Sequence, residues 1–459
     1  MIQSLRDWLR AQLQRFVKNP LLQRVIRNSG YLFSAKTGSA ALSFGQSILA
    51  GRLLGVAGLG VLGAITQFSG LINRLTSFRM GDFVVNYVGE YSARGDDEGA
   101  AAVFKVASLV EILTSALSYG LILALASLAA RILTPDQDLA GLFALYGLTV
   151  LVNLMAESAN GLLQIFDRYR LIALISFGQS ALTLLLIGIA FIMQASLTAV
   201  VLAYLAGKAV WALSISFAAL GQARRSWGAG WWRASISTLA PRRREMVRFA
   251  VSTNITATLT LVTRDSEMLW LNALSSPTQA GYYKLALAFT NVLLIPVDPL
   301  ISTTYREVAR EAGGGRWENV RYLLRSGSLI SAAFTLPAAL GLAILGPWII
   351  SLTYGPEFIP AHSSLLILLA GVLVVNIFYW NRNALLPLGM PEYPTKVYFV
   401  GAVLRVGAIL LVVPQYGAHG MAALLSLFFA LTTGVLVWKT LLELKRAEES
   451  RPAVQVGST

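Results

Sequence analysis

Cysteine is missing from the 459-residue chain, and histidine occurs only twice, at His362 and His419. The absence of cysteine excludes disulfides, thiolate metal sites, thiol nucleophiles and cysteine-ligated iron–sulfur clusters. The two histidines fall near predicted helix ends far apart in the sequence, so we expect no metal site. The sequence also lacks a P-loop and an HExxH pattern, and no Ser/His/Asp set is expected because both histidines fall at outer helix ends. We therefore predict no catalytic residue and no cofactor.

Charge is scarce as well. Only 13% of the residues are charged, whereas 56% are hydrophobic and the mean hydropathy is +0.63. An ordinary soluble domain has about 25% charged residues, so that class is excluded. A membrane-spanning helix takes about 20 mainly apolar residues, and about twelve such helices would account for the apolar share of the chain. The sequence therefore predicts an all-α polytopic membrane protein.

Twelve apolar runs can be drawn between charged residues and Gly, Pro or Asn. They cover residues 30–51, 60–81, 106–130, 140–163, 171–193, 197–219, 250–272, 280–303, 326–350, 361–384, 395–413 and 418–441. With the N-terminus in the cytoplasm, 28 of the 37 Lys and Arg residues fall on inner segments and two on outer ones. This asymmetry predicts twelve spans with both termini cytoplasmic, and it explains the net charge of +14 without nucleic acid.

Six spans in each half predict two bundles related as a parallel repeat. Gly60 and Phe68 stand eight residues apart in the second span, as do Gly281 and Phe289 in the eighth. We expect an amphipathic helix on the cytoplasmic surface at residues 1–26 and a cytoplasmic tail at 442–459. Between them we expect an N-terminal bundle at 27–220, a cytoplasmic interfacial linker rich in Trp and Arg at 221–248, and a C-terminal bundle at 249–441. A disordered basic tail is the alternative for the first segment.

Polar residues follow one face of the first span of each half. These stripes comprise Lys36, Ser39, Ser43 and Gln46, and Ser252, Thr256, Thr260, Thr263 and Glu267. Lipid does not tolerate such faces, so we expect a central cavity between the bundles. Alternatively, the hydroxyls bond back to their own helices or join neighbouring helices.

Ionisable residues within the spans need partners or water. The cationic set is Lys36, Arg74, Lys208, Arg264, Lys284, Arg382 and Arg405, and the acidic set is Glu111, Glu157, Asp265, Glu267 and Asp298. Glu267 lies three residues after Arg264, so these two can pair. Asp298 lies between Pro296 and Pro299, which predicts a kink and a hinge in the eighth span. Each of these charges has packed ion pairing as its open alternative.

Three short segments carry a resemblance to a known family. They are Arg52-Leu53-Leu54-Gly55 followed by Gly58-Leu59-Gly60, Asp265 with Ala280-Gly281-Tyr282-Tyr283 and Ala286, and Gly417-Ala418-His419-Gly420-Met421-Ala422-Ala423. The chain resembles the polysaccharide-transporter branch of the multidrug/oligosaccharidyl-lipid/polysaccharide exporter superfamily, which includes the O-antigen and exopolysaccharide flippases. The basic N-terminal extension and the Trp-rich linker depart from that pattern.

The resemblance implies two MATE-like bundles that open alternately to each side of the bacterial inner membrane. The implied cargo is an undecaprenyl-diphosphate-linked oligosaccharide, for lipopolysaccharide or other surface polymers, whose lipid tail stays among membrane lipids. Under this hypothesis the cavity candidates for the substrate are Lys36, Ser39, Ser43, Gln46, Arg74, Thr256, Thr260, Arg264 and Arg405. The candidates for ion coupling or gating are Asp265, Glu267, Asp298 and Glu157.

Two other functions remain open at the sequence level. One is a drug or metabolite cation antiporter of the same superfamily. The other is a membrane subunit that transports nothing itself and belongs to a complex with a polysaccharide polymerase or glycosyltransferase.

Overall fold

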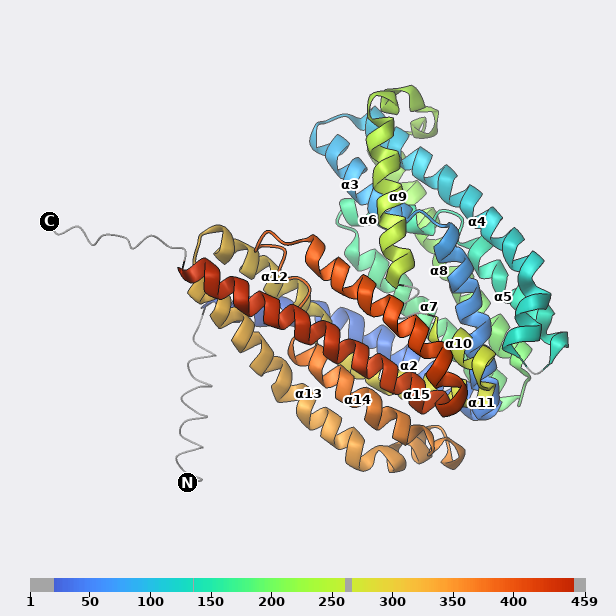
Figure 1. The fold of residues 1–459 in the computed structure, drawn as a ribbon. Helices are drawn as coiled ribbons and strands as arrows, with labels where there is room; N and C mark the ends of the chain where they lie inside the picture. Colours follow the sequence, from blue (N-terminus) through green and yellow to red (C-terminus); the bar gives the residue numbers. More distant parts are fainter. Residues whose placement is uncertain (1–19, 135, 261–265, 450–459) are drawn as a thin grey trace.

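The computed structural model describes residues 20–134, 136–260 and 266–449 (Figure 1). Within these ranges the chain forms helices joined by turns and short loops, without a β-strand. The predicted surface helix at 1–26 falls mostly outside the described residues, as does most of the predicted tail at 442–459.

The described part of the first half contains seven α-helices and a short 3-10 turn. Their bounds are α2 (Pro20–Thr76), α3 (Met80–Ala93), α4 (Asp97–Leu133), η1 (Gln137–Leu139), α5 (Ala140–Val152), α6 (Ala156–Ile165), α7 (Tyr169–Ile192) and α8 (Leu197–Trp227). Asp96 caps α4, because its side chain accepts a 2.8 Å hydrogen bond from the Gly99 amide.

A linker of two 3-10 turns leads into the second half. The elements from there on are η2 (Trp231–Arg233), η3 (Ile236–Arg242), α9 (Arg243–Thr260), α10 (Glu267–Leu274), α11 (Pro277–Leu294), α12 (Asp298–Gly313), α13 (Trp317–Thr353), η5 (Pro356–Phe358), α14 (Ala361–Ile377) and α15 (Glu392–Glu449). Ser276 caps α11 and Pro277 begins it, which is a favourable start for a helix.

Seven stretches of the described chain are long and apolar enough to cross a membrane. Two of them, Gly38–Thr76 and Glu392–Glu449, each contain a reversal of direction and therefore two spans. The remaining predicted spans coincide with α9 and α10, which flank the undescribed residues 261–265, with the broken pair α11 and α12, and with the shorter apolar α14. The described residues thus match the twelve predicted spans, and the all-α prediction is confirmed.

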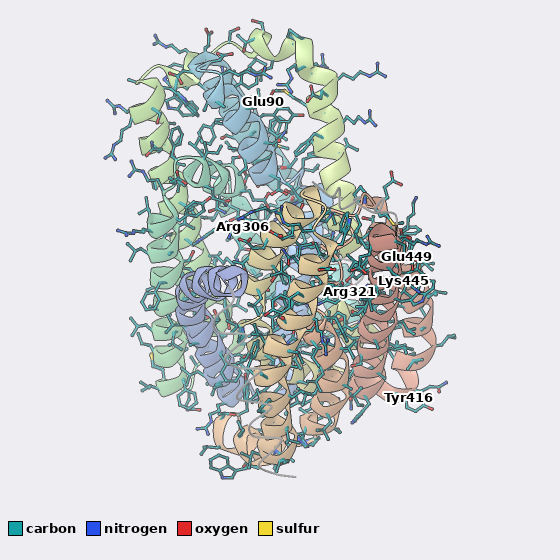
Figure 2. All side chains as sticks on the ribbon, turned by 90° about the vertical axis from the view of Figure 1, so that its left-hand side faces the viewer. Glu90, Arg306, Arg321, Tyr416, Lys445 and Glu449 are labelled. Carbon is teal, nitrogen blue, oxygen red and sulfur yellow. The ribbon has the colours of Figure 1, made fainter. Side chains whose placement is uncertain are left out.

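Each reversal depends on a glycine. Gly55 inside α2 has φ 67°, and Gly417 inside α15 has φ 51°. Residues with a Cβ rarely adopt such positive φ values, whereas glycine does so at little cost. In Figure 2, Tyr416 beside the second reversal lies well below Lys445 and Glu449, which are near the other end of α15. The two halves of α15 therefore run antiparallel along the length of the fold.

Apolar side chains on the outer surface are consistent with a lipid environment. Leu113, Phe217 and Leu411 are each 70% or more exposed, and many further Leu, Ile and Val residues are exposed on the described helices. Such an extensive apolar exterior is unfavourable in water but is solvated by lipid tails. The protein is a membrane protein.

The predicted repeat is visible where α2 crosses α11. A Cβ placed on Gly60 would lie 1.9 Å from the Pro277 carbonyl oxygen, and one placed on Gly281 would lie 2.0 Å from the Val56 carbonyl oxygen. The two contacts are reciprocal, because a shift of 221 positions converts Val56 and Gly60 into Pro277 and Gly281. The same shift converts Phe68 into Phe289. We call this end of the molecule the crossing end.

Toward the other end, the helices separate into two arms (Figure 1). A shared hydrophobic core at the crossing end contains Leu62, Phe289 and Tyr354 from both halves. Beyond it lie two separate cores, one formed by residues 80–246 and one by residues 297–444. We call the helices around the first of these cores the first arm (α3, α4, α6, α8 and α9) and those around the second core the second arm (α12–α15). The end of the molecule where the two arms diverge is called the basic end.

At the basic end, the first helix of each half packs against helices of the other half. The Phe249 ring of α9 lies 5.5 Å from the Tyr87 ring of α3, and α2 contacts α12 as well as α7. The predicted bundle boundaries at 27–220 and 249–441 stay a prediction.

Candidate functional site

Each arm contains a polar pocket at a point where its helices are broken. The pocket of the second arm has a volume of about 620 Å³ and lies between α11, α12, residues 378–391 and α15. Its polar lining includes Asp298, Asn376, Tyr379, Arg382 and Tyr398.

The break between α11 and α12 forms one wall of this pocket. α11 ends at Leu294, and α12 begins at Asp298 after Pro296. Asn376 uses one carbonyl freed by the break, since its Nδ2 donates a 3.0 Å hydrogen bond to the Leu293 oxygen. Tyr379 is fixed by a 2.7 Å hydrogen bond between its hydroxyl and Thr304 Oγ1. The structure therefore agrees with the predicted kink around Asp298.

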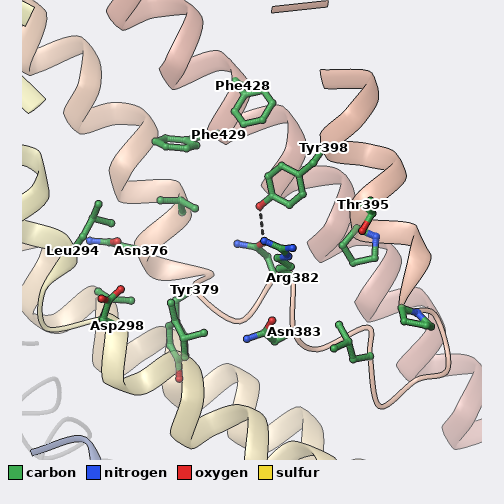
Figure 3. Close-up of a pocket in the computed structure, with 17 residues that line it drawn as sticks. Leu294, Asp298, Asn376, Tyr379, Arg382, Asn383, Thr395, Tyr398, Phe428 and Phe429 are labelled. Carbon is green, nitrogen blue, oxygen red and sulfur yellow. Dashed lines mark hydrogen bonds between the residues drawn. The ribbon is translucent and has the colours of Figure 1, made fainter. Parts of the chain in front are cut away.

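Opposite charges face the pocket from two sides. Figure 3 shows Arg382 beside Tyr398, with Asp298 on the other side of the cavity. The Arg382 guanidinium lies 5.8 Å from the Tyr398 ring centre, and the Tyr398 hydroxyl donates to Asn381 Oδ1 at 3.4 Å. The buried Oδ1 of Asn376 has no hydrogen-bond donor among the described residues. This pocket thus offers a cation, an anion and a buried acceptor to a polar ligand.

The pocket of the first arm has a volume of about 480 Å³. Its polar lining includes Arg74, Arg79, Asp82, Glu157 and Asn160. It lies where α2 gives way to α3 through Arg79, at φ 50°, and where α5 gives way to α6. Arg79 Nη2 and Asp82 Oδ2 form a 2.9 Å salt bridge, and half of each side chain is exposed.

The two pockets occupy corresponding places in the repeat. The shift of 221 positions converts Ser77 into Asp298 and Asn160 into Asn381, and all four residues line a pocket. Like Asn376, Asn160 has a buried Oδ1 with no donor in the described part of the chain. Both halves of the chain therefore place carboxylate, amide and guanidinium groups around a broken helix.

A buried ion pair lies between α10 and α15, apart from both pockets. Glu267 Oε1 accepts a hydrogen bond from Arg405 Nη2, and each side chain is only 3% exposed. Tyr283 donates to Glu267 Oε2 at 2.7 Å, and the Arg405 guanidinium lies 5.7 Å from the Phe428 ring centre. For Arg405 and Glu267 the structure thus gives the packed pair that was the open alternative.

In the polar stripe of the first span, Gln46 packs against a neighbouring helix, whereas Ser43 is exposed. Gln46 is buried, and its Nε2 donates a 2.8 Å hydrogen bond to the Ser180 carbonyl oxygen. Ser43 is exposed, and its hydroxyl bonds back to the Ser39 oxygen of the same helix at 2.9 Å. Gln46 corresponds to Glu267 under the shift of 221, so the first helix of each half uses the same position to hold a neighbouring helix.

Several predicted residues lie outside what the structure describes. Arg264 and Asp265 belong to the undescribed segment 261–265, and the side chains of Lys36, Thr256 and Thr260 are also outside the description. Among the predicted residues that are described, Arg74 and Glu157 lie together in the first-arm pocket, and Asp298 lies in the second-arm pocket.

The sequence did not mark Arg79, Asn160, Asn376 and Asn381 as site candidates, and Arg382 was named only among the cationic residues within the spans. The offset between Gly60 and Gly281 was the pattern that relates Asn160 to Asn381. Glu111, named in the acidic set within the spans, is buried and structural. Its carboxylate accepts hydrogen bonds of 2.8 and 2.9 Å from the Glu157 and Ser158 amides at the start of α6.

A family model described as "Polysaccharide biosynthesis protein" matches residues 25–305. No curated protein sequence matches the chain significantly. An inward-facing multidrug resistance MATE family transporter of the MOP superfamily has a similar structure, with a TM-score of 0.74 at 15% identity over 90% of this chain and 96% of that one.

Lipid II flippase MurJ in its inward closed conformation gives a TM-score of 0.71 at 15% identity, over 91% of this chain and 90% of that one. An outward-facing conformation of a MATE family transporter gives 0.65 at 14% identity, over 95% and 98%. At these identities the likeness shows the fold, and it confirms the predicted MATE-like arrangement of two bundles.

Proposed function

Because the chain belongs to the polysaccharide biosynthesis protein family, we propose that it is a flippase for a lipid-linked oligosaccharide. The cargo is an undecaprenyl-diphosphate-linked oligosaccharide, which is moved across the bacterial inner membrane for the synthesis of a surface or extracellular polysaccharide. The observation that carries this proposal is the pair of corresponding polar pockets, one in each arm of a fold shared with a lipid II flippase.

The cargo poses a physical problem that two arms can solve. Sugars and a diphosphate cannot cross hydrocarbon unaided, since their lost hydrogen bonds and hydration cost many kcal/mol. The polyprenyl tail needs no such protection and stays in the bilayer. A head group between the arms would meet guanidinium groups of Arg74, Arg79 and Arg382, which suit phosphate oxygens, and amides of Asn160 and Asn376, which suit sugar hydroxyls.

Under this proposal the arms exchange which end is closed. In the proposed cycle the basic end, where the arms diverge (Figure 1), is the open one, while the crossing end is held by the Gly60 and Gly281 contact and by Arg52, whose Nε donates a 2.6 Å hydrogen bond to the Thr353 oxygen. With the positive-inside orientation, the open end faces the cytoplasm, where the termini and the lipid-linked precursor are.

Ion coupling belongs to the same proposal. The candidate carboxylates are Glu157 and Asp298 in the pockets, Glu267 in the buried pair, and Asp265. Transport driven by protons or sodium should fall when both gradients are collapsed, and it should fall in Asp265→Asn. Transport unchanged by both interventions would remove ion coupling from the account but leave passive flipping.

A drug or metabolite cation antiporter is the second candidate, favoured by the MATE likeness and by the acidic residues Asp82 and Glu157 in the first-arm pocket. A cationic drug would be repelled by Arg74 and Arg79 in the same pocket, which favours an anionic head group. Efflux of cationic dyes from cells that express the chain would support this second candidate.

Reconstitution tests the proposed function directly. The purified chain in vesicles should move a fluorescent undecaprenyl-diphosphate oligosaccharide to the opposite leaflet, as measured by the fraction accessible to a membrane-impermeant quencher. Arg382→Gln should slow the movement at least about tenfold, because a charge-assisted contact to phosphate is lost. Arg325→Gln, outside both pockets, is the matched control. A wild-type rate equal to protein-free vesicles would refute the flippase and leave a scaffold within a polymerase or glycosyltransferase complex.

A further inference from the structure

An apolar groove runs along the first arm, apart from the two polar pockets. It has a volume of about 590 Å³ and lies between α3, α4, η3 and α9. Its floor is formed by the buried side chains of Met80, Phe83 and Met246. Its rim is open, since Ile236, Val247 and Val251 are 48%, 56% and 44% exposed.

The linker residues hold the groove in shape. Lys105 Nζ of α4 donates a 3.2 Å hydrogen bond to the Ala234 carbonyl oxygen, and the Phe104 ring lies 5.3 Å from the Trp231 ring. Leu239 of η3 is buried against the same arm. The packing of the linker against α4 therefore maintains the shape of the groove.

Positive charge gathers at one end of the groove. Arg243 lines the groove at the first turn of α9, with Arg244 and Arg248 exposed on the same helix. None of these three arginines has a carboxylate partner within the described residues, whereas their neighbour Arg242 is paired with Glu90 at 2.8 Å and with Glu245 at 2.8 Å. Guanidinium groups without a carboxylate partner among the described residues therefore lie at one end of the apolar groove.

The dimensions of the groove fit one leaflet of a bilayer. Arg243, Val247 and Val251 follow one face of α9 at steps of four, so the lined stretch is about 12 Å long at 1.5 Å per residue. One leaflet of the hydrocarbon core is about 15 Å thick. Leu109 and Leu113 are exposed on α4, which also supplies Val106 and Val110 to the groove, so that surface is one that lipid covers.

We propose that this groove is a binding site for a membrane phospholipid with an anionic head group. The phosphate contacts Arg243 and its exposed neighbours, and one acyl chain fills the groove between α4 and α9. The cargo of the proposed flippase is a different molecule in a different place, because its head group belongs in the polar pockets. The proposal therefore stands whether or not that function is correct.

Photoreactive phosphatidylglycerol with a diazirine in its acyl chain tests the proposal on the full chain in phosphatidylcholine nanodiscs. Crosslinks should map to residues 243–251, and unlabelled phosphatidylglycerol should displace them while phosphatidylcholine does not. Arg243→Gln should weaken binding about fivefold, since each basic residue near a membrane surface contributes about 1 kcal/mol to binding of anionic lipid. Arg225→Gln, an exposed arginine of the preceding helix that does not line the groove, should bind normally.

A second pair of variants tests the apolar groove separately from the charge of Arg243. Val247→Trp should fill the groove and abolish the crosslinks although Arg243 is intact, whereas Val210→Trp on the exposed surface of α8 should leave them unchanged. Equal crosslinking in Arg243→Gln and Arg225→Gln would overturn the proposal. Displacement by undecaprenyl diphosphate at lower concentrations than phosphatidylglycerol would overturn it too, because the groove would then hold the cargo's tail.

Discussion

At the scale of single residues, the buried Glu267–Arg405 pair makes the sharpest stability prediction. Glu267→Gln removes the Glu267 carboxylate from the buried Arg405 guanidinium, and removing one partner of a buried ion pair costs about 3–5 kcal/mol in comparable sites. We expect a clear loss of thermal stability for the purified chain in detergent. Arg321→Gln, which breaks the exposed pair with Glu448, should cost about 1 kcal/mol or less.

A double variant separates the pair from the individual side chains. Glu267→Gln with Arg405→Met removes both charges, so it should be more stable than Glu267→Gln alone. A double variant no more stable than the single one would show that the pair is not the source of the loss.

The Glu267–Arg405 pair cannot be recognised from the sequence. Arg264 stands three residues before Glu267 and was the available partner, whereas Arg405 is 138 residues away. Spacing along one helix reveals which side chains share a face, but the helix that packs against that face is fixed by the tertiary fold. The same limit applies to Gln46, whose partner Ser180 lies 134 residues away.

At the scale of helices, the joint between α12 and α13 should respond to pH. Glu311 is buried and accepts hydrogen bonds from Arg316 Nε at 2.6 Å and from Asn319 Nδ2 at 2.8 Å. Arg316, chiefly through this hydrogen bond, lowers the pKa of Glu311 from 4.5 to about 2. A lowered folded-state pKa stabilises the joint above about pH 4.5, and this stabilisation is lost as the pH falls toward 2.

Hydrogen exchange of residues 311–319 measures this effect. Protection should fall severalfold between pH 5 and pH 2.5 beyond the intrinsic pH dependence of exchange. Glu311→Gln should show low protection at both pH values. A wild-type joint whose corrected protection is constant across this range would contradict the assigned role of Glu311.

The crossing of α2 and α11 makes a second prediction about helices. Gly60→Ala places a methyl group where the Pro277 carbonyl oxygen now lies, so the two helices must move apart. We expect a lower melting temperature and a loosened crossing end. Gly70→Ala is the matched control, because its Cβ would meet nothing within 4 Å and alanine favours a helix. Equal melting temperatures for the two variants would exclude a tight crossing.

At the scale of the whole molecule, most of the fold was predictable and the pockets were not. The distribution of Lys and Arg fixes twelve spans, and the spacing of Gly60 and Phe68 recurs at Gly281 and Phe289. Pro296 and Pro299 predicted the break beside Asp298. By contrast, no proline lies near Thr76 or Val152, where α2 and α5 end. No residue pattern marks those two breaks, so the pocket around Arg74 and Glu157 needed the structure.

In the proposed mechanism the two arms exchange their open and closed ends. The chain has no cysteine, so spin labels on introduced cysteine pairs report single distances without background. Glu98→Cys with Glu318→Cys spans the basic end, where both residues are exposed, and Gln194→Cys with Gln415→Cys spans the crossing end, where both are exposed as well.

Distances between these labels, measured by double electron–electron resonance in nanodiscs with and without lipid-linked oligosaccharide, test the claim most directly. We predict a long basic-end distance and a short crossing-end distance without cargo. With cargo, a second population should have a shorter basic-end distance and a longer crossing-end distance. Two distances that stay fixed, or that change in the same direction, would contradict alternating access by these arms.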